Sequence, residues 1–255
     1  MSLRILRRII FSTCVTVAFV IMPYAQASES TLQPEIVQLP LSMSNMFLIK
    51  STKPVLIDGG SNGDMPALIQ GLAAHGVKIQ DVTLVILTHS HSEHAGMAAE
   101  FQRAGIKVAL GDGDSPMAKS GHNDDVKPTS LMALFIKHFV VNPNFEPYVP
   151  DIVIKDSFDL RPWGIEGHAQ QMPGHTPGSL VVLLDDGRAF VGDMILGGYM
   201  GGRFNPHKAG EHYFQANGEQ NFQNIQNMLK QSIKTFYLGH GGPVDRSSVV
   251  EAFGK

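Results

Sequence analysis

Three histidines and one glutamate lie within six residues, directly after the apolar run Leu84 to Leu87. The segment reads His89-Ser90-His91-Ser92-Glu93-His94. Imidazole nitrogens and carboxylate oxygens are the usual ligands of zinc. His89 and His91 are two residues apart on an extended segment, so their side chains point the same way. A lone histidine is more often an ordinary core residue, but this dense set predicts a metal site that could activate water.

Three later segments carry further metal-binding side chains at the ends of predicted strands. His175 lies in the turn Pro173 to Ser179, Asp193 follows the apolar strand Phe190 to Gly192, and His240 stands between glycines after the last predicted strand. Loops at strand ends allow side chains from distant segments to converge. Each residue alone is a weak signal, because an aspartate at a strand end is usually a turn or capping residue.

The order of these motifs resembles that of the metallo-β-lactamase superfamily, over roughly Asp58 to Pro243. The family's leading motif, His-x-His-x-Asp-His, matches the segment from His89 to His94. Its third histidine, its bridging aspartate and its last histidine match His175, Asp193 and His240. The resemblance implies a four-layer αββα sandwich of the α/β class, with the site at one edge of the two sheets.

The resemblance also implies which residues hold the metal. One zinc would be held by His89, His91 and His175, and a second by Glu93, His94 and His240, with Asp193 bridging the two ions. Asp58-Gly59-Gly60 resembles the family's early turn, whose aspartate steadies the metal-binding loop. The chain departs from the family at Glu93, where an aspartate is usual. Glutamate is one methylene longer, so it can bind the second ion after a small shift or can weaken that site. We therefore expect one or two Zn2+ ions.

A zinc-dependent hydrolase is the activity that the resemblance implies. Zinc lowers the pKa of bound water to about 7, so that a metal-bound hydroxide can attack a carbonyl. Glu93 or Asp193 would then pass a proton to the leaving group. In the glycine-rich stretch after Asp193, Tyr199 could donate a hydrogen bond to the oxyanion and Arg203 could bind a carboxylate. Both could equally be ordinary loop residues.

The expected reaction on a small-molecule substrate is ring opening of a β-lactam or a lactone. β-Lactamases of subclasses B1 and B2 have a cysteine at the place of Asp193, and they are disfavoured because the only cysteine here is Cys14. The alternatives are a thioester or ester hydrolase with glyoxalase II-like chemistry, or a non-catalytic metal-binding member of the fold.

Residues 1–27 have the pattern of a secretory signal peptide. Arg4, Arg7 and Arg8 precede an apolar run that ends in the small-x-small site Ala25-Gln26-Ala27. The run is shorter than the roughly 20 residues that span a bilayer. We therefore expect one hydrolase domain at 28–255, a periplasmic or secreted location, and no membrane association after cleavage. The paired arginines leave both general and twin-arginine export open.

The charge and cysteine content narrow the classes of partner. The chain has 20 basic and 23 acidic residues, and cleavage would remove three arginines and no acid, changing the formal charge from −3 to −6. This charge and the lack of a basic stripe argue against nucleic-acid binding. Cys14 would leave with the signal, so the mature protein would have no disulfide and no cysteine metal ligand. The sequence leaves the oligomeric state open.

Short apolar strands alternate with amphipathic helices, which is typical of a layered α/β protein. Strands are expected at 47–49, 55–57, 84–87, 106–110, 179–184, 188–192 and 236–238, and helices at 65–75, 95–104, 130–140, within 215–232 and at 247–253. Residues 112–150 interrupt this rhythm with one helix, whose expected apolar face includes Leu131 and Phe135. The insertion could pack on the core, cover a pocket as a lid or make a dimer contact.

Six of the 11 histidines fall outside the motifs. His207 and His212 are expected on the surface. The other four are expected to be structural or solvated: His75, His122, His138 and His168.

Overall fold

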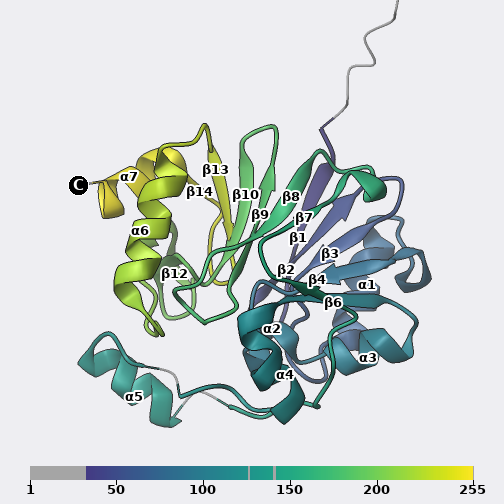
Figure 1. Ribbon diagram of the computed structural model, residues 1–255, viewed down its shortest axis with the longest axis horizontal. Helices are drawn as coiled ribbons and strands as arrows, with labels where there is room; N and C mark the ends of the chain where they lie inside the picture. The colour runs from purple at the N-terminus through teal and green to yellow at the C-terminus, as the bar shows by residue number, and fades with distance from the viewer. Residues whose placement is uncertain (1–32, 126, 140–141, 255) are drawn as a thin grey trace, which may run out of the picture. The chain divides into compact units, whose positions relative to one another are not determined.

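The computed structural model describes residues 33–125, 127–139 and 142–254, which belong to one compact unit, Gln33–Lys255 (Figure 1). The expected signal peptide lies outside the described residues. Within the described ranges, no helix has the length and apolar character needed to cross a bilayer.

The first sheet has six strands in the order β1–β2–β3–β4–β5–β6. These are β1 (Glu35–Pro40), β2 (Asn45–Lys50), β3 (Val55–Ile57), β4 (Leu84–Ile86), β5 (Lys107–Gly111) and β6 (Ile152–Ile154). The first three strands are antiparallel neighbours, and β3 to β6 run parallel. Strands β3 and β4 are apolar and buried at every position, as expected for strands covered on both faces.

The second sheet also has six strands, in the order β14–β13–β10–β9–β8–β7. These are β7 (Ser157–Asp159), β8 (Gly167–Gln171), β9 (Leu180–Leu184), β10 (Arg188–Gly192), β13 (Thr235–Leu238) and β14 (Val244–Asp245). Only β10 and β13 pair in parallel. A separate hairpin pairs β11 (Leu196–Tyr199) with β12 (Phe204–Gly210).

Three buried apolar clusters identify four layers. Helices α1 (Met65–Ala74) and α3 (Ala98–Arg103) pack on the outer face of the first sheet, where Phe101 meets Leu48 and Val85. A second cluster lies between the sheets and joins Phe47 to Phe190, whose rings are 5.2 Å apart. The third packs α6 (Gly218–Leu229) and α7 (Arg246–Phe253) on the second sheet. The helices thus flank the paired sheets (Figure 1), and the αββα sandwich implied by the family resemblance is confirmed.

The helix expected at 95–104 is two short helices, α2 (Ser92–Ala95) and α3, separated at Gly96. The amide of Gly96 donates to Gly60 O at 2.8 Å, and a Cβ on Gly96 would lie 2.4 Å from Asn62 N. The chain therefore bends against the turn after β3, and α2 begins early enough to include Glu93 and His94. The glycine-rich stretch expected as a pocket loop is largely the β11–β12 hairpin.

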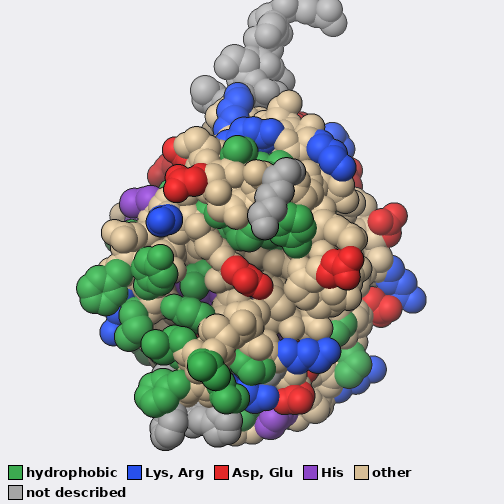
Figure 2. Space-filling view, turned by 90° about the vertical axis from the view of Figure 1, so that its left-hand side faces the viewer, with side chains coloured by type: hydrophobic (Ala, Val, Ile, Leu, Met, Phe, Trp, Pro, Cys, Tyr) green, Lys and Arg blue, Asp and Glu red, His purple; other side chains and the backbone are tan. Residues whose placement is uncertain are grey.

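The insertion at 112–150 contains α4 (Ser115–Ser120) and α5 (Leu131–Phe139). The expected apolar face of α5 does not pack on the core: Leu131 is 88% exposed and Phe135 is 58% exposed. Instead Ala133 is buried against Phe214. Hydrophobic side chains accordingly gather on the lower part of the face shown in Figure 2, where α5 lies. The lid and the dimer contact both stay predictions.

Three short 3-10 helices complete the described elements: η1 (Ile79–Asp81), η2 (Asp112–Asp114) and η3 (Arg161–Trp163).

Candidate metal centre

The seven residues expected as metal ligands come together at strand ends of both sheets. In the first sheet, His89 and His91 follow β4, and α2 adds Glu93 and His94. In the second sheet, the ligands follow three different strands: His175 after β8, Asp193 after β10 and His240 after β13. The two sheets therefore each supply part of one polar cluster at their strand ends.

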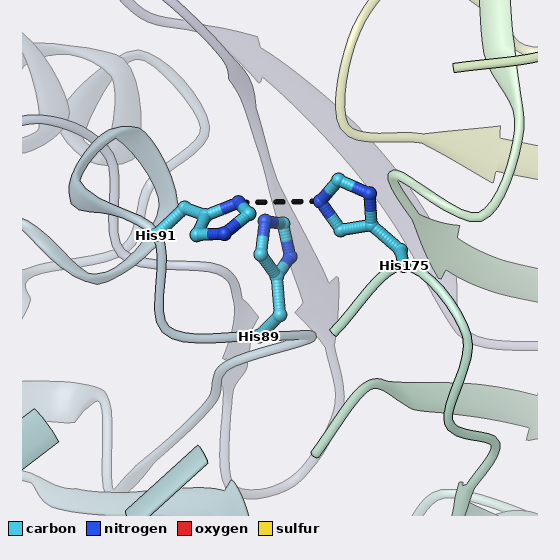
Figure 3. Close-up of side chains that lie close together, drawn as sticks. All are labelled: His89, His91 and His175. Atoms are coloured by element: carbon cyan, nitrogen blue, oxygen red, sulfur yellow. Dashed lines mark hydrogen bonds between the residues drawn. The ribbon is translucent and has the colours of Figure 1, made fainter. Parts of the chain in front are cut away.

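His89, His91 and His175 form the first group (Figure 3). His91 Nδ1 lies 3.2 Å from His175 Nε2, and all three rings are buried. The far nitrogen of each ring is held by another group: His89 Nδ1 contacts Thr88 Oγ1 at 3.1 Å, His91 Nε2 contacts Asp124 Oδ1 at 3.1 Å, and His175 Nδ1 contacts Phe214 O at 2.9 Å. Such contacts orient each ring so that its other nitrogen faces the metal position.

Asp193 lies at the centre of the second group, with Glu93, His94 and His240. Its Oδ1 is 3.5 Å from His94 Nε2, and its Oδ2 is 3.4 Å from His240 Nε2. Although its side chain is fully buried, neither oxygen accepts a hydrogen bond, and His94 Nε2 has no hydrogen-bond partner either. Unsatisfied buried polar atoms are costly and rare. A divalent cation that binds these atoms directly would satisfy them, so the donor set fits zinc.

Asp58 supports the second group from the turn after β3. Its Oδ2 is 3.1 Å from His94 Nδ1, and its Oδ1 accepts hydrogen bonds from Thr88 N at 2.7 Å and from Thr88 Oγ1 at 2.8 Å. The backbone of Asp58 has φ 67°, a conformation that is uncommon for a residue other than glycine. These contacts are those expected of an aspartate that steadies the metal-binding loop.

Burial and neighbouring charges lower the pKa of some ligands and raise that of others. Burial, together with neighbouring histidines, holds the pKa of His89 and of His175 well below the usual value. For Asp193, burial alone would raise the pKa, but the nearby His240 and His94 hold it well below the usual value. For His94, burial is outweighed by Asp193 and Asp58, which raise the pKa well above the usual value. These directions favour the ionised form of Asp193 and the protonated form of His94, so binding of a metal by His94 would release a proton.

His212 was expected on the surface, and this prediction was wrong. It follows β12, is 5% exposed, and its Nε2 lies 3.2 Å from Asp193 Oδ2. Its ring meets that of His175 edge-on, with centroids 4.7 Å apart. His212 belongs to no recognisable sequence motif. The apolar Phe214, two residues later, indicates only that this segment could be buried, and in the structure Phe214 packs in a buried cluster with Ala133.

The remaining predicted residues lie outside the cluster. Tyr199 is 55% exposed at the end of β11, and within the described part of the chain its hydroxyl makes no hydrogen bond to the cluster. Arg203 and His207 are exposed. Of the histidines expected to be structural or solvated, His75 and His122 are exposed and His168 is half-buried, while the side chain of His138 lies outside the described residues.

The family model of the metallo-β-lactamase superfamily matches residues 39–240. This match covers most of the chain, and the protein belongs to the metallo-β-lactamase superfamily. The fold and the paired ligand groups described above are consistent with that membership, and the family match and its metallo-hydrolase relative indicate the class of metal-dependent hydrolases.

Individual relatives agree with the family. A probable metallo-hydrolase of Methanocaldococcus jannaschii is 29% identical over 206 residues, which is 80% of this chain and 90% of the relative. A metallo-β-lactamase family protein of Thermus thermophilus has a similar structure, with a TM-score of 0.61, 21% identity, and coverage of 85% of this chain and 77% of that one. The B3 metallo-β-lactamase BLEG-1 has a TM-score of 0.62, 19% identity, and coverage of 86% and 98%. These two structures share the fold.

Glu93 reaches the second group despite its extra methylene. It is half-buried, its carboxylate accepts a hydrogen bond from Ser92 Oγ at 3.1 Å, and one carboxylate oxygen lies within 4.8 Å of the donor atoms of His94, Asp193 and His240. We expect Glu93→Asp to bind metal at least as well as the native chain and Glu93→Gln to lose affinity at the second position. Metal per chain, measured after dialysis against a limiting chelator, checks this. If both variants kept the native metal content and rate, Glu93 would not be a ligand.

Proposed function

We propose that the protein is a zinc-dependent hydrolase that opens the ring of a β-lactam or a lactone after export to the periplasm. The observation that carries the proposal is the fully buried carboxylate of Asp193. Imidazole nitrogens of five histidines lie within 3.9 Å of its oxygens, and neither oxygen accepts a hydrogen bond. A purely structural cluster would pair these atoms with each other.

The chain's residues would divide the chemistry as follows. His89, His91 and His175 would hold one zinc, and Glu93, His94 and His240 a second, with Asp193 between them. Zinc at this position would polarise the substrate carbonyl and lower the pKa of water toward 7. Glu93 is the carboxylate better placed to accept and return a proton, because it is half-buried whereas Asp193 is enclosed. Before zinc binds, burial would raise the pKa of Glu93, but the nearby His91 and His94 outweigh burial and lower it.

One sequence feature disfavours β-lactamases of subclasses B1 and B2, and another supports a β-lactam substrate. Asp193 occupies the position where subclasses B1 and B2 have a cysteine, and Cys14 is the only cysteine of the chain. The N-terminal segment would direct the protein to the compartment where β-lactams act. Among the solved structures with the same fold, one is named a B3 metallo-β-lactamase. A lactone also reacts at a strained or activated cyclic carbonyl. The proposal therefore includes both lactones and β-lactams.

The test is turnover by residues 28–255 loaded with zinc, on a chromogenic cephalosporin, a γ-lactone and an acyl thioester, with and without a chelator. We expect chelator-sensitive ring opening of the cephalosporin or the lactone, and its loss in Asp193→Ala, which removes the central carboxylate. Turnover of the thioester alone would instead favour glyoxalase II-like chemistry. Zinc bound at full content without turnover of any substrate would favour a non-catalytic metal-binding protein.

Export has its own prediction. Cleavage after Ala27 should leave a mature chain that begins at Ser28, because Ala25 and Ala27 are the small residues that signal peptidase requires. Mass spectrometry of the periplasmic fraction checks the new N-terminus. Ala27→Arg should block processing, whereas Arg7→Lys combined with Arg8→Lys should block it only if export uses the twin-arginine route. An unprocessed chain in the cytoplasm would contradict the proposed location.

A further inference from the structure

His212 reaches the metal centre because the segment that carries it is tied to the site on several sides. The amide of Ala216 donates to His175 O at 2.9 Å, and the amide of Gln215 donates to Lys127 O at 3.1 Å. Phe214 is buried against Ala133 of α5. These contacts hold the segment against the site, where the imidazole of His212 is 5% exposed and faces Asp193.

One carbonyl contacts two imidazoles. Phe214 O lies 2.9 Å from His175 Nδ1 and 3.2 Å from His212 Nδ1. If each Nδ1 carries the hydrogen and donates it to this oxygen, each Nε2 has a free lone pair directed into the cluster. This is the arrangement of a typical metal-binding histidine. His212 Nδ1 is also 3.3 Å from Phe214 N, so the opposite tautomer, with a hydrogen on Nε2, is the rival arrangement.

The distances around Asp193 favour coordination over a hydrogen bond. A charge-assisted N–H to carboxylate hydrogen bond is about 2.7–2.9 Å long. Two ligand atoms that share a tetrahedral zinc, each about 2.0–2.2 Å from the ion, lie about 3.3–3.5 Å apart. His212 Nε2 is 3.2 Å from Asp193 Oδ2, close to the 3.4 Å between Asp193 Oδ2 and His240 Nε2. His212 is therefore spaced from Asp193 much as the expected ligand His240 is.

We propose that His212 is an eighth metal ligand, which binds through Nε2 in a donor group with His175 and Asp193. Two imidazole nitrogens and one carboxylate oxygen suit zinc and similar divalent ions of the first transition series. The proposal rests on the metal centre of the proposed function, but it concerns this chain's own ligand set and not the reaction. It gives the ion held by His175 and Asp193 a nitrogen donor beyond those of the family motif.

Direct observation of a metal–nitrogen bond tests the proposal. The processed protein, labelled with ¹⁵N-histidine, is reconstituted with ¹¹³Cd, and scalar coupling between each imidazole nitrogen and cadmium is measured by NMR. We expect coupling at His212 Nε2 as well as at the first-group histidines. Coupling at His89, His91 and His175 with none at His212 overturns this proposal alone. No coupling at any histidine overturns the metal centre itself, and with it the proposed function.

Zinc affinity provides a second readout that does not depend on turnover. In competition with a chromophoric chelator, His212→Ala and His212→Gln should both weaken zinc binding at least about tenfold. The glutamine amide can still donate a hydrogen bond to Asp193 but is a poor zinc ligand, so native affinity in His212→Gln would overturn the proposal. His207→Ala is the matched control, because His207 is exposed on β12. Its zinc affinity should equal that of the native chain.

Discussion

Replacing Gly239 by alanine should empty the metal centre while leaving the fold in place. A Cβ at this position would lie 2.1 Å from Asp193 Oδ1 and 2.6 Å from His94 Cε1. Real Cβ contacts are never this short, so either the Asp193 carboxylate or the strand end must move. His94 is held by Asp58, and the backbone of Gly239 is held by Asn45 N, which donates to its carbonyl oxygen at 2.8 Å. The methyl group must therefore displace Asp193 from its position between the two ligand groups.

We expect Gly239→Ala to hold less than about a tenth of the native zinc and to lose at least about 100-fold in kcat/KM, because ångström-scale misplacement of reacting groups has effects of this size. Elemental analysis and turnover on the best substrate measure the two losses, and circular dichroism checks the fold. Gly210→Ala is the matched control, since the nearest heavy atom to its added Cβ is Leu196 O at 4.0 Å. Native zinc content in Gly239→Ala would contradict the placement of Asp193 beside His94.

The strands and the layers could be predicted from the sequence because they rest on local pattern. Residues 84–87 are uniformly apolar and form β4, and the turn at 185–187 between two apolar runs joins β9 to β10. The break at Gly96 could not be predicted, because its cause is a contact with the backbone of Asn62. The exposure of α5 could not be predicted either. Its pattern is amphipathic, but only the fold determines that Phe214 meets Ala133 instead of the expected face.

Some residues of the candidate site could likewise be predicted from the sequence, and others could not. The seven expected ligands lie in short motifs at strand ends, and the structure places their donor atoms together. Two of the groups that hold those ligands are single residues far away in sequence: Asp124 contacts His91 from 33 residues later, and Phe214 contacts His175 from 39 residues later. A lone aspartate or a backbone carbonyl has no sequence signature. His212 went unrecognised for the same reason, because its role comes from its neighbours in space.

Asp114 is the buried residue whose loss should most weaken the link between the two sheets at the site. It is fully buried at the end of η2, and it accepts three hydrogen bonds. In the loop that carries His89 and His91, Ser90 N donates to Asp114 Oδ2 at a distance of 3.0 Å. In the loop that carries His175, Thr176 Oγ1 donates to Asp114 Oδ2 at 2.8 Å, and Gly178 N donates to Asp114 Oδ1 at 2.7 Å. One carboxylate thus holds together the two loops that carry the first ligand group.

At pH ~4, where the contribution of Asp114 to stability is complete, Asp114→Asn should lower the free energy of unfolding by about 2–4 kcal/mol, because the amide nitrogen would face an N–H or O–H donor and leave it unsatisfied in the interior. Zinc affinity should fall about 10- to 100-fold, as for other residues that orient ligands. Denaturant unfolding of the zinc-free protein and chelator competition measure the two effects. The control is Asp112→Asn, an exposed neighbour in the same turn, which should change neither. A native zinc affinity in Asp114→Asn would mean that the two loops are held together without this carboxylate.

The stability of the native protein and that of Asp114→Asn should also depend differently on pH. Burial raises the pKa of Asp114 to about 6, against roughly 3.9 in an unfolded chain. Between these values the native state binds a proton that the unfolded state has lost, so this residue's contribution to stability is complete below pH ~4 and falls as the pH rises through ~6. The stability difference between native and Asp114→Asn protein should therefore shrink by up to ~3 kcal/mol from pH 4 to pH 6. Titrating groups that do not interact with Asp114 are common to both proteins and cancel in this difference. A constant difference would mean that the three hydrogen bonds outweigh burial and keep Asp114 ionised throughout this range.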